Sequence, residues 1–240
     1  MKFTVLHLSQ IPIEEAHGGS GARQMLIKPE FLTTPHLEAI TKGYLSVGKM
    51  FDWHNHIETD EIFIVTQGNG KFYYKEQERE HFFDYKPDDV IIAPANLFHK
   101  IVAEGTEETQ GFFFRIKTKQ GVIHNRTFIQ KNIKDVPLEA IHTVKDTRKT
   151  LVTVDMVASD YLEAITKGIL RSGDTWEIHE HIDTDEVGIV LKGQGVWVIE
   201  GQEVPYTAGT IVIVQGNVLH TQRAQGDTPT EFFFIRVKVA

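Results

Sequence analysis

The chain alternates short runs of β-branched and aromatic residues with clusters of Gly, Asn, Asp and Pro. Such runs are typical of β-strands, and the clusters between them are typical of turns. The strands that we expect are residues 61–65, 71–74, 90–93 and 111–117, and then 186–191, 196–199, 211–214 and 231–238. Helical periodicity is limited to single turns that we expect near residues 12–16 and 137–141. Many short strands at regular spacing predict an all-β protein built from antiparallel sandwiches or barrels.

The whole pattern occurs twice. Residues 37–43 and 162–168 both read Leu-Glu-Ala-Ile-Thr-Lys-Gly, which gives an offset of 125. After about residue 78 the offset falls to 121, because the first copy carries four extra residues near positions 79–83. A repeat of this length is a domain, since solenoid units repeat every 20–50 residues or so. We therefore expect two domains, residues 1–120 and 126–240.

Each copy contains three histidines and one glutamate at the spacing of metal ligands. A His-x-His is followed five residues later by Glu, and a further His comes later in each copy. The residues are His54, His56, Glu61 and His99 in the first copy and His179, His181, Glu186 and His220 in the second. Three imidazoles and a carboxylate suit a divalent first-row transition metal. A lone His-x-His is more often a pair of surface histidines, but the full set found twice predicts up to two metals per chain.

At these residues the sequence resembles the cupin family, and in particular the bicupins. The first family motif, G-x5-H-x-H-x4-E-x6-G, is matched in full by residues 48–68 and 173–193. The second motif is matched less completely, because Asp88, Asn96 and Asn217 stand where it has Gly. These differences concern the shape of turns and leave the ligands in place. The resemblance implies two tandem cupin-type jelly-roll β-barrels with the metal inside each barrel.

Four protein ligands leave two positions of an octahedral ion open for a bidentate ligand, or for a substrate beside dioxygen. The resemblance to bicupin dioxygenases implies an oxidoreductase, a metal-dependent dioxygenase acting on a small oxygenated organic compound. One alternative is a metal-dependent isomerase or decarboxylase in which Glu61 or Glu186 acts as a catalytic proton shuttle after leaving the metal. Another is a small-molecule-binding or regulatory bicupin. The fold does not decide among them, and the metal stays open among Fe, Mn, Zn and Ni.

The composition excludes several classes of protein. The chain has no Cys, which rules out disulfides, Fe–S clusters and thiolate zinc sites. A formal net charge of −8 without a Lys/Arg cluster argues against nucleic-acid binding. The N-terminus is too short and polar for a signal peptide, and no apolar run approaches membrane-spanning length. We expect a cytoplasmic protein without a membrane partner, whose halves pack against each other or against a second chain in a homodimer.

Other matched residues carry weaker predictions. His17 and His142 precede the barrel strands, which favours a structural or interfacial role. In a strand over residues 112–116, Phe112, Phe114 and Ile116 alternate onto one side, which looks like the core face. We therefore expect Arg115 and its match Arg236 to face solvent or the other domain, instead of a substrate.

Two further pairs lie close to the ligands in sequence. Asp52 and Glu177 share strand parity with the first His of each motif, and we expect acids there to face water at the barrel mouth. Phe63 and Gly188 follow the ligand glutamates by two residues and share their face. Because Phe fills volume and Gly leaves a cavity, we expect the C-terminal site to be the more accessible one. The alternative is that Gly188 marks a bulge or a close backbone contact.

Overall fold

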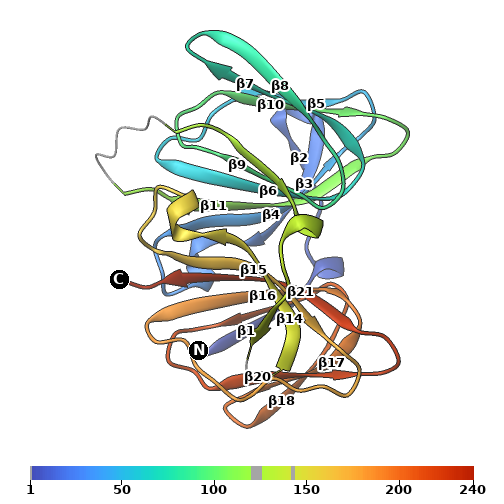
Figure 1. The fold of residues 1–240 in the computed structure, drawn as a ribbon, viewed down its shortest axis with the longest axis vertical. Coiled ribbons are helices and arrows are strands. Elements are labelled where there is room, and N and C mark those ends of the chain that lie inside the picture. The colour runs from blue at the N-terminus through green and yellow to red at the C-terminus, as the bar shows by residue number, and fades with distance from the viewer. Residues whose placement is uncertain (1, 120–125, 142–143) are drawn as a thin grey trace.

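Two β-barrels make up the computed structural model, which describes residues 2–119, 126–141 and 144–240 (Figure 1). Within these ranges each barrel has a large and a small antiparallel sheet. The large sheet of the first barrel has the order β12 (Ile129–Asn132), β9 (Asp89–Ala93), β6 (Thr59–Gln67), β11 (Thr109–Lys117), β4 (Leu37–Leu45), β3 (Gly21–Ile27) and β2 (Glu14–Ala16). Its small sheet has the order β5 (Met50–His54), β10 (His99–Glu104), β7 (Asn69–Glu76) and β8 (Arg79–Tyr85).

The second barrel repeats this plan. Its large sheet has the order β1 (Phe3–His7), β19 (Thr210–Val214), β16 (Thr184–Lys192), β21 (Thr230–Lys238), β15 (Leu162–Leu170), β14 (Val144–Thr153) and β13 (Glu139–Ile141). Its small sheet has the order β18 (Gln202–Thr207), β17 (Gln194–Ile199) and β20 (His220–Gln225). Short 3₁₀ turns lie at η1 (Leu8–Gln10), η2 (His17–Gly19), η3 (Pro29–Phe31), η4 (Ile133–Asp135) and η5 (Val154–Met156). No helix in the described part of the chain is long and apolar enough to cross a membrane.

The all-β class is confirmed, and each predicted strand lies inside an observed one. The single helical turns predicted near residues 12–16 and 137–141 are wrong, because β2 and β13 occupy these segments as strands paired with β3 and β14. An isolated helical turn is unstable by itself, so sheet pairing prevails. The extra residues of the first copy lengthen the β7–β8 hairpin, which projects from the upper barrel in Figure 1.

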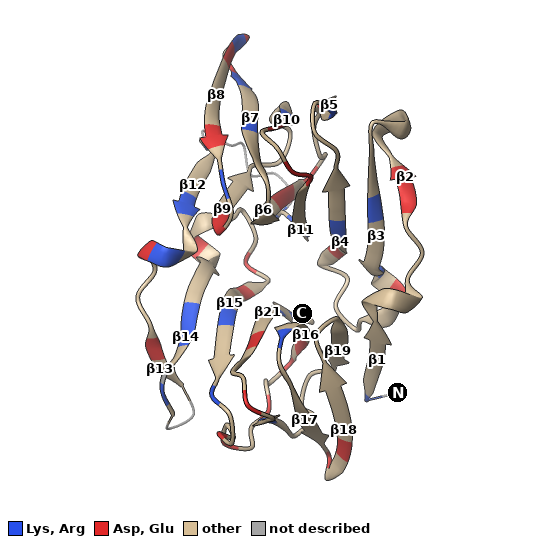
Figure 2. Ribbon diagram, turned by 90° about the vertical axis from the view of Figure 1, so that its right-hand side faces the viewer, with Lys and Arg blue, Asp and Glu red and all other residues tan. Residues whose placement is uncertain are grey.

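The first strand of each repeat joins the barrel of the other repeat. β1 pairs with β19, and β12 pairs with β9, both antiparallel. Figure 2 shows β1 running below β3 into the lower barrel, while β12 lies in the upper barrel. Phe3 packs against the core of the second barrel and Phe128 against that of the first. Sheet pairing therefore crosses the boundary between the two expected domains. The bounds 1–120 and 126–240 stay a proposal for the two duplicated units.

The large sheets of the two barrels face each other across a shared hydrophobic layer. Phe112 of β11 meets Phe233 of β21 with ring centroids 5.8 Å apart. Phe114 and Ile235 belong to the same buried cluster, and burying one such side chain contributes roughly 1.5–3 kcal/mol. The opposite faces of these strands line the separate barrel interiors. The prediction that the halves pack together is confirmed, whereas the homodimer stays a prediction.

Candidate metal centres

The predicted ligands of the first copy converge inside the first barrel. His54 ends β5 and pairs with His99 at the start of β10, while Glu61 comes from β6 in the opposing large sheet. The Nε2 atom of His56 lies 3.2 Å from Glu61 Oε1, and that of His99 lies 3.4 Å from Glu61 Oε2. One ligand atom from each of the four residues lies within 4.8 Å of the others.

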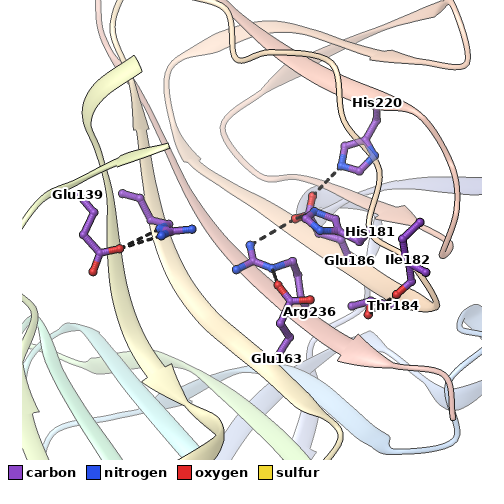
Figure 3. Close-up of polar contacts among 9 residues, drawn as sticks. Glu139, Glu163, His181, Ile182, Thr184, Glu186, His220 and Arg236 are labelled. Atoms are coloured by element: carbon purple, nitrogen blue, oxygen red, sulfur yellow. Dashed lines mark hydrogen bonds and ion pairs between the residues drawn. The ribbon is translucent and has the colours of Figure 1, made fainter. Parts of the chain in front are cut away.

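The second copy reproduces this arrangement. His179 and His220 exchange backbone hydrogen bonds of 3.0 and 2.8 Å. The Nε2 atoms of His181 and His220 lie 3.1 and 3.3 Å from the two oxygens of Glu186. Ligand atoms of the three histidines lie within 4.8 Å of one another. Figure 3 shows His181 and His220 approaching Glu186, with Arg236 also beside this carboxylate.

Hydrogen bonds to the backbone orient the imidazoles. Each of four rings lies with Nδ1 at 2.7–3.1 Å from the carbonyl oxygen two residues earlier in the chain. The pairs are His54 with Asp52, His99 with Leu97, His179 with Glu177 and His220 with Val218. Since a carbonyl only accepts, Nδ1 carries the proton and donates it, and the Nε2 lone pair is free to bind a metal.

Unpaired nitrogen atoms test whether these residues fit a metal. The Nε2 atoms of His56, His99, His181 and His220 are buried and make no hydrogen bond within the described residues. Leaving such an atom unpaired costs about 1–3 kcal/mol. A divalent ion among the imidazoles and the carboxylate gives every one of these atoms a partner, so the residues present fit such an ion.

The turns of the second motif keep their shape despite the missing glycines. Asp88, Asn96 and Asn217 have φ values of 72°, 66° and 63°. Asn and Asp adopt this left-handed region more readily than other non-glycine residues. The backbone N–H groups of Asn96 and Asn217 donate to the carbonyls of His56 and His181 at 2.8 and 2.9 Å. These turns therefore hold the second His of each motif in place.

The prediction that Arg115 and Arg236 face solvent or the other domain is wrong. Arg115 Nε donates to Glu61 Oε1 at 3.2 Å. Arg236 Nε donates to Glu163 at 2.7 Å, and its Nη1 lies 3.7 Å from Glu186. Both strands are buried on two faces, and the face with the arginines is the one that lines the barrel interior. Each guanidinium therefore stabilises the ionised form of a ligand carboxylate.

The remaining predicted residues divide between the mouth and the wall of the barrel. Asp52 and Glu177 are exposed, as expected, and take part through their backbone carbonyls. His17 lies beside the first centre, with its ring centroid 4.5 Å from that of His54. The structural or interfacial role of His17 stays a prediction. His142 lies outside the described residues.

A small cavity adjoins each set of ligands. The first has about 20 Å³ of space for the centres of water-sized molecules, and the second about 30 Å³. One water needs roughly 10–15 Å³ on this measure, so each cavity suits a ligand of a few atoms. The first is lined by Ala16, His17, Arg23, Thr41, Gly43, Phe51, His54, Glu61, Ile101, Phe113 and Arg115. The second is lined by Ile141, Thr147, Arg148, Thr166, Gly168, Trp176, His179, His181, Glu186, Gln222, Phe234 and Arg236.

Gly188 does not open a cavity for a ligand, so the reason given for a more accessible C-terminal site is wrong. A Cβ atom at Gly188 would lie 2.3 Å from Cη2 of Trp197. In the first barrel Phe63 occupies the matched position, and there a Cβ at Gly111 would lie 2.3 Å from its ring. Phe232 is the match of Gly111 in the second barrel. Each barrel thus combines one Phe with one Gly, and the close-contact alternative is confirmed.

Gly188→Phe is therefore expected to destabilise the protein instead of blocking a ligand. Overpacking of this kind costs about 1–3 kcal/mol or more, because Trp197 must move. Adding Phe232→Gly and Trp197→Phe gives the second barrel the side chains that the first barrel has at the matched positions. The triple variant should therefore recover much of the lost stability. Urea unfolding of the single and triple variants measures both effects. Equal stability of Gly188→Phe and the parent would contradict the packing argument.

Burial and charge shift the pKa of one ligand histidine in each centre. Burial and the nearby His99 lower the pKa of His54 to about 4. Burial also lowers the pKa of His220, but the adjacent Glu186 carboxylate outweighs it and raises this pKa overall. Although burial raises the pKa of Glu61 and Glu186, the surrounding imidazoles hold both well below the usual value.

The raised pKa of His220 predicts that acid releases metal from the C-terminal centre. Metal binding requires neutral imidazoles, and protonation of His220 removes one of them. Metal retained after dialysis should therefore fall as the pH is lowered from about 7.5 to about 4.5. The measurement uses the His99→Ala variant, which keeps only the C-terminal centre. Full metal content at the lowest pH would contradict the prediction.

A buried acid precedes each ligand glutamate, and its role was not predicted from the sequence. Asp60 and Asp185 are 0 % and 2 % exposed. Asp185 accepts hydrogen bonds from the backbone of Thr33 and Thr34, and Asp60 accepts one from the backbone of Ala158. Each carboxylate therefore binds the other half of the chain. The signal was present, since Thr-Asp-Glu occurs in both copies.

Comparison with solved structures gives the same architecture. Protein Ylba from E. coli aligns with a TM-score of 0.74 and 12% identity over 98% of this chain and 90% of that one. A mutant oxalate decarboxylase from Bacillus subtilis aligns with a TM-score of 0.75 and 14% identity, over 98% and 77%. The formate complex of oxalate decarboxylase from Lactobacillus farciminis gives 0.73 and 13%, over 98% and 85%. At these identities the likeness concerns the fold alone.

A comparison with curated protein sequences gives no match. The model of the cupin domain family, in contrast, matches residues 44–114 and 169–236, which together exceed half of the chain. Both matched segments contain a complete candidate ligand set. The chain belongs to the cupin family and carries two cupin domains, each with a group of His and Glu side chains suited to a metal.

Proposed function

We propose that this protein is a metal-dependent enzyme that acts on a small carboxylic acid, with a decarboxylase-type reaction. The charge around the candidate centres carries this proposal. Apart from Glu186 and the histidines, the ionisable residues that line the second cavity in the described part of the chain are Arg148 and Arg236. Their carboxylate partners Glu139 and Glu163 do not line it. With a divalent ion added, the lining is predominantly positive and favours an anionic ligand.

The roles of the residues follow from their positions. The bound metal supplies Lewis-acid stabilisation of negative charge that develops on a carboxylate or carbonyl oxygen. Arg236 Nη1 lies 3.7 Å from Glu186 and adds positive charge to the cavity. Trp176 and Phe234 line the same cavity and exclude bulk water, which strengthens these electrostatic interactions. Because the pKa of Glu186 lies well below its usual value, this carboxylate is ionised and available as a metal ligand.

The choice of reaction type draws on the related folds. The similar structures from Bacillus subtilis and Lactobacillus farciminis are oxalate decarboxylases, and the latter holds formate. At 13–14% identity this supports the class of substrate more than the reaction itself. A dioxygenase reaction uses the same ligand set with its two open metal positions, and it stays the alternative.

Product analysis tests the proposal. The protein loaded separately with Fe, Mn, Zn or Ni is incubated with oxalate, glyoxylate, glycolate or malonate, and CO₂ release and O₂ uptake are followed. We expect CO₂ without stoichiometric O₂ uptake for at least one acid. One O₂ consumed per turnover would favour the dioxygenase. No turnover, together with a metal spectrum that no acid changes, would indicate structural metals and contradict an enzymatic role. The His220→Ala variant is the control for adventitious metal.

A further inference from the structure

Three lining positions of the second cavity are more polar than their matches in the first repeat, and one of them, Thr147 in place of Ala22, donates its hydroxyl to the carbonyl of Val144 at 3.1 Å. Phe51 of the first cavity is replaced by Trp176 in the second, and Ile101 is replaced by Gln222. The arginines, the threonines and the phenylalanine at matched positions are the same in both. The second cavity therefore has an indole N–H and a carboxamide where the first has hydrocarbon.

Neither polar group has a partner in the described part of the chain. Gln222 is 1 % exposed, and its Oε1 makes no hydrogen bond with any described residue. Trp176 is 5 % exposed, and its Nε1 also makes none. The two residues are neighbours, because the backbone N–H of Trp176 donates to the carbonyl of Gln222 at 3.1 Å. Buried amides without partners are rare, and each calls for an explanation.

The fold itself does not require these polar groups. Ile101 and Phe51 fill the matched positions of the first barrel and are 1 % and 5 % exposed. A barrel of the same architecture is thus built with apolar side chains there. An unpaired amide lowers stability relative to such side chains, so the function of the second cavity is the better explanation for it.

The position of Gln222 relates it to the metal ligands. It follows His220 by two residues on β20, so both side chains share the face that lines the barrel. Two residues along a strand span about 6–7 Å. A ligand bound at the candidate metal centre reaches the carboxamide only if it carries a second polar group a few bonds away from the first. Its size is limited by the small volume of the cavity.

We propose that the C-terminal cavity selects a small bifunctional acid, in which a carboxylate binds at the metal centre and a hydroxyl, oxo or amide group binds Gln222 and Trp176. This inference rests on the proposed function, because it assumes an open metal position. Gln222 and Trp176 are specificity-determining residues. The N-terminal cavity lacks both groups and does not distinguish such a compound from a simple carboxylate.

A matched pair of probes tests this selectivity. Glycolate and acetate share a carboxylate, and glycolate has one more hydroxyl. Each is titrated into the Mn(II)-loaded protein, and binding is followed by Mn(II) EPR. We expect glycolate to bind the C-terminal centre at least about tenfold more tightly than acetate, since a site with hydrogen-bonding groups rejects the analogue that leaves them unpaired. In Gln222→Ile and Trp176→Phe, which introduce the residues of the first barrel, the preference should fall below about threefold with metal content unchanged.

Controls separate this inference from the proposed function. Ile101→Gln in the first barrel should leave the tight glycolate phase of the second unchanged. The proposed selectivity is wrong if acetate and glycolate bind the parent equally, or if both variants keep the tenfold preference. Either result still leaves the proposed open metal position in place. If neither probe changes the EPR spectrum of the parent, the proposed function and this inference both fail. If Gln222→Ile does not fold, the preference of Trp176→Phe for glycolate over acetate tests the selectivity alone.

Discussion

Replacing His220 with alanine is expected to empty the C-terminal centre while the N-terminal centre stays loaded. His220 supplies a buried Nε2 that accepts no hydrogen bond from any residue the structure describes, and its ring is oriented by the carbonyl of Val218. Changing a residue that merely supports a metal ligand typically costs 10–100-fold in metal affinity, so loss of a ligand should cost more than about 100-fold. His99→Ala should have the corresponding effect on the N-terminal centre. Elemental analysis after dialysis measures the metal that each variant retains.

The matched control is Glu177→Ala. Glu177 is exposed and takes part through its backbone carbonyl, which accepts from His179, so this variant should keep its metal and its activity. In His220→Ala any turnover of a small acid that depends on this centre should drop by at least about 100-fold. Full metal content in both His220→Ala and His99→Ala would show that the imidazoles are not ligands, and the proposed function would fail with them.

The ligand sets could be predicted from the sequence because their spacing is unusual and occurs twice. Metal ligation depends on the types of the ligand residues and on their order, and both can be read from a sequence. The distribution between strands was also accessible: His99 and Glu61 come from different sheets, as the separation in sequence suggests. His56 was less predictable, since it lies in the loop after β5 instead of on the strand itself.

The orientation of Arg115 was not accessible in the same way. Alternation shows that neighbouring residues of a strand face opposite sides, but it identifies the interior only when the other side is polar. β11 carries Phe112 into the layer between the barrels and Phe113 into the barrel interior. With both faces apolar, the pattern gives no reason to prefer one of them. The arginine lies on the face of Phe113.

The exchange of β1 and β12 was hidden for a related reason. The two strands occupy equivalent places in the repeat, and each pairs antiparallel with the matched strand of the other barrel. Which barrel a strand joins depends on the path of the chain between the barrels, and no local pattern encodes that path. The packing of Gly188 against Trp197 likewise depends on a contact between separate strands.

Replacing Asp185 or Asp60 with alanine is expected to cause the largest loss of stability among the variants considered. Asp185 accepts from the backbone N–H groups of Thr33 and Thr34 at 2.7 and 2.9 Å and from that of Gly216 at 3.1 Å. In either alanine variant several buried donors lose their partner together. Each unpaired group costs about 1–3 kcal/mol, so we expect a loss of about 3–5 kcal/mol, as for a broken buried ion pair.

The same carboxylates join the two halves, so their removal should also change how the protein unfolds. Asp60 accepts from Arg126 Nη1 and from the backbone N–H of Ala158 at 2.6 Å each, and both donors belong to the second repeat. Urea unfolding of Asp60→Ala should therefore show a lower midpoint and a less cooperative transition than the parent. Asp84→Ala is the control, because Asp84 is 81% exposed and its removal should change stability by less than about 0.5 kcal/mol. If Asp60→Ala and Asp185→Ala cost no more than this control, the carboxylates do not hold the halves together, and the shared apolar layer alone must do so.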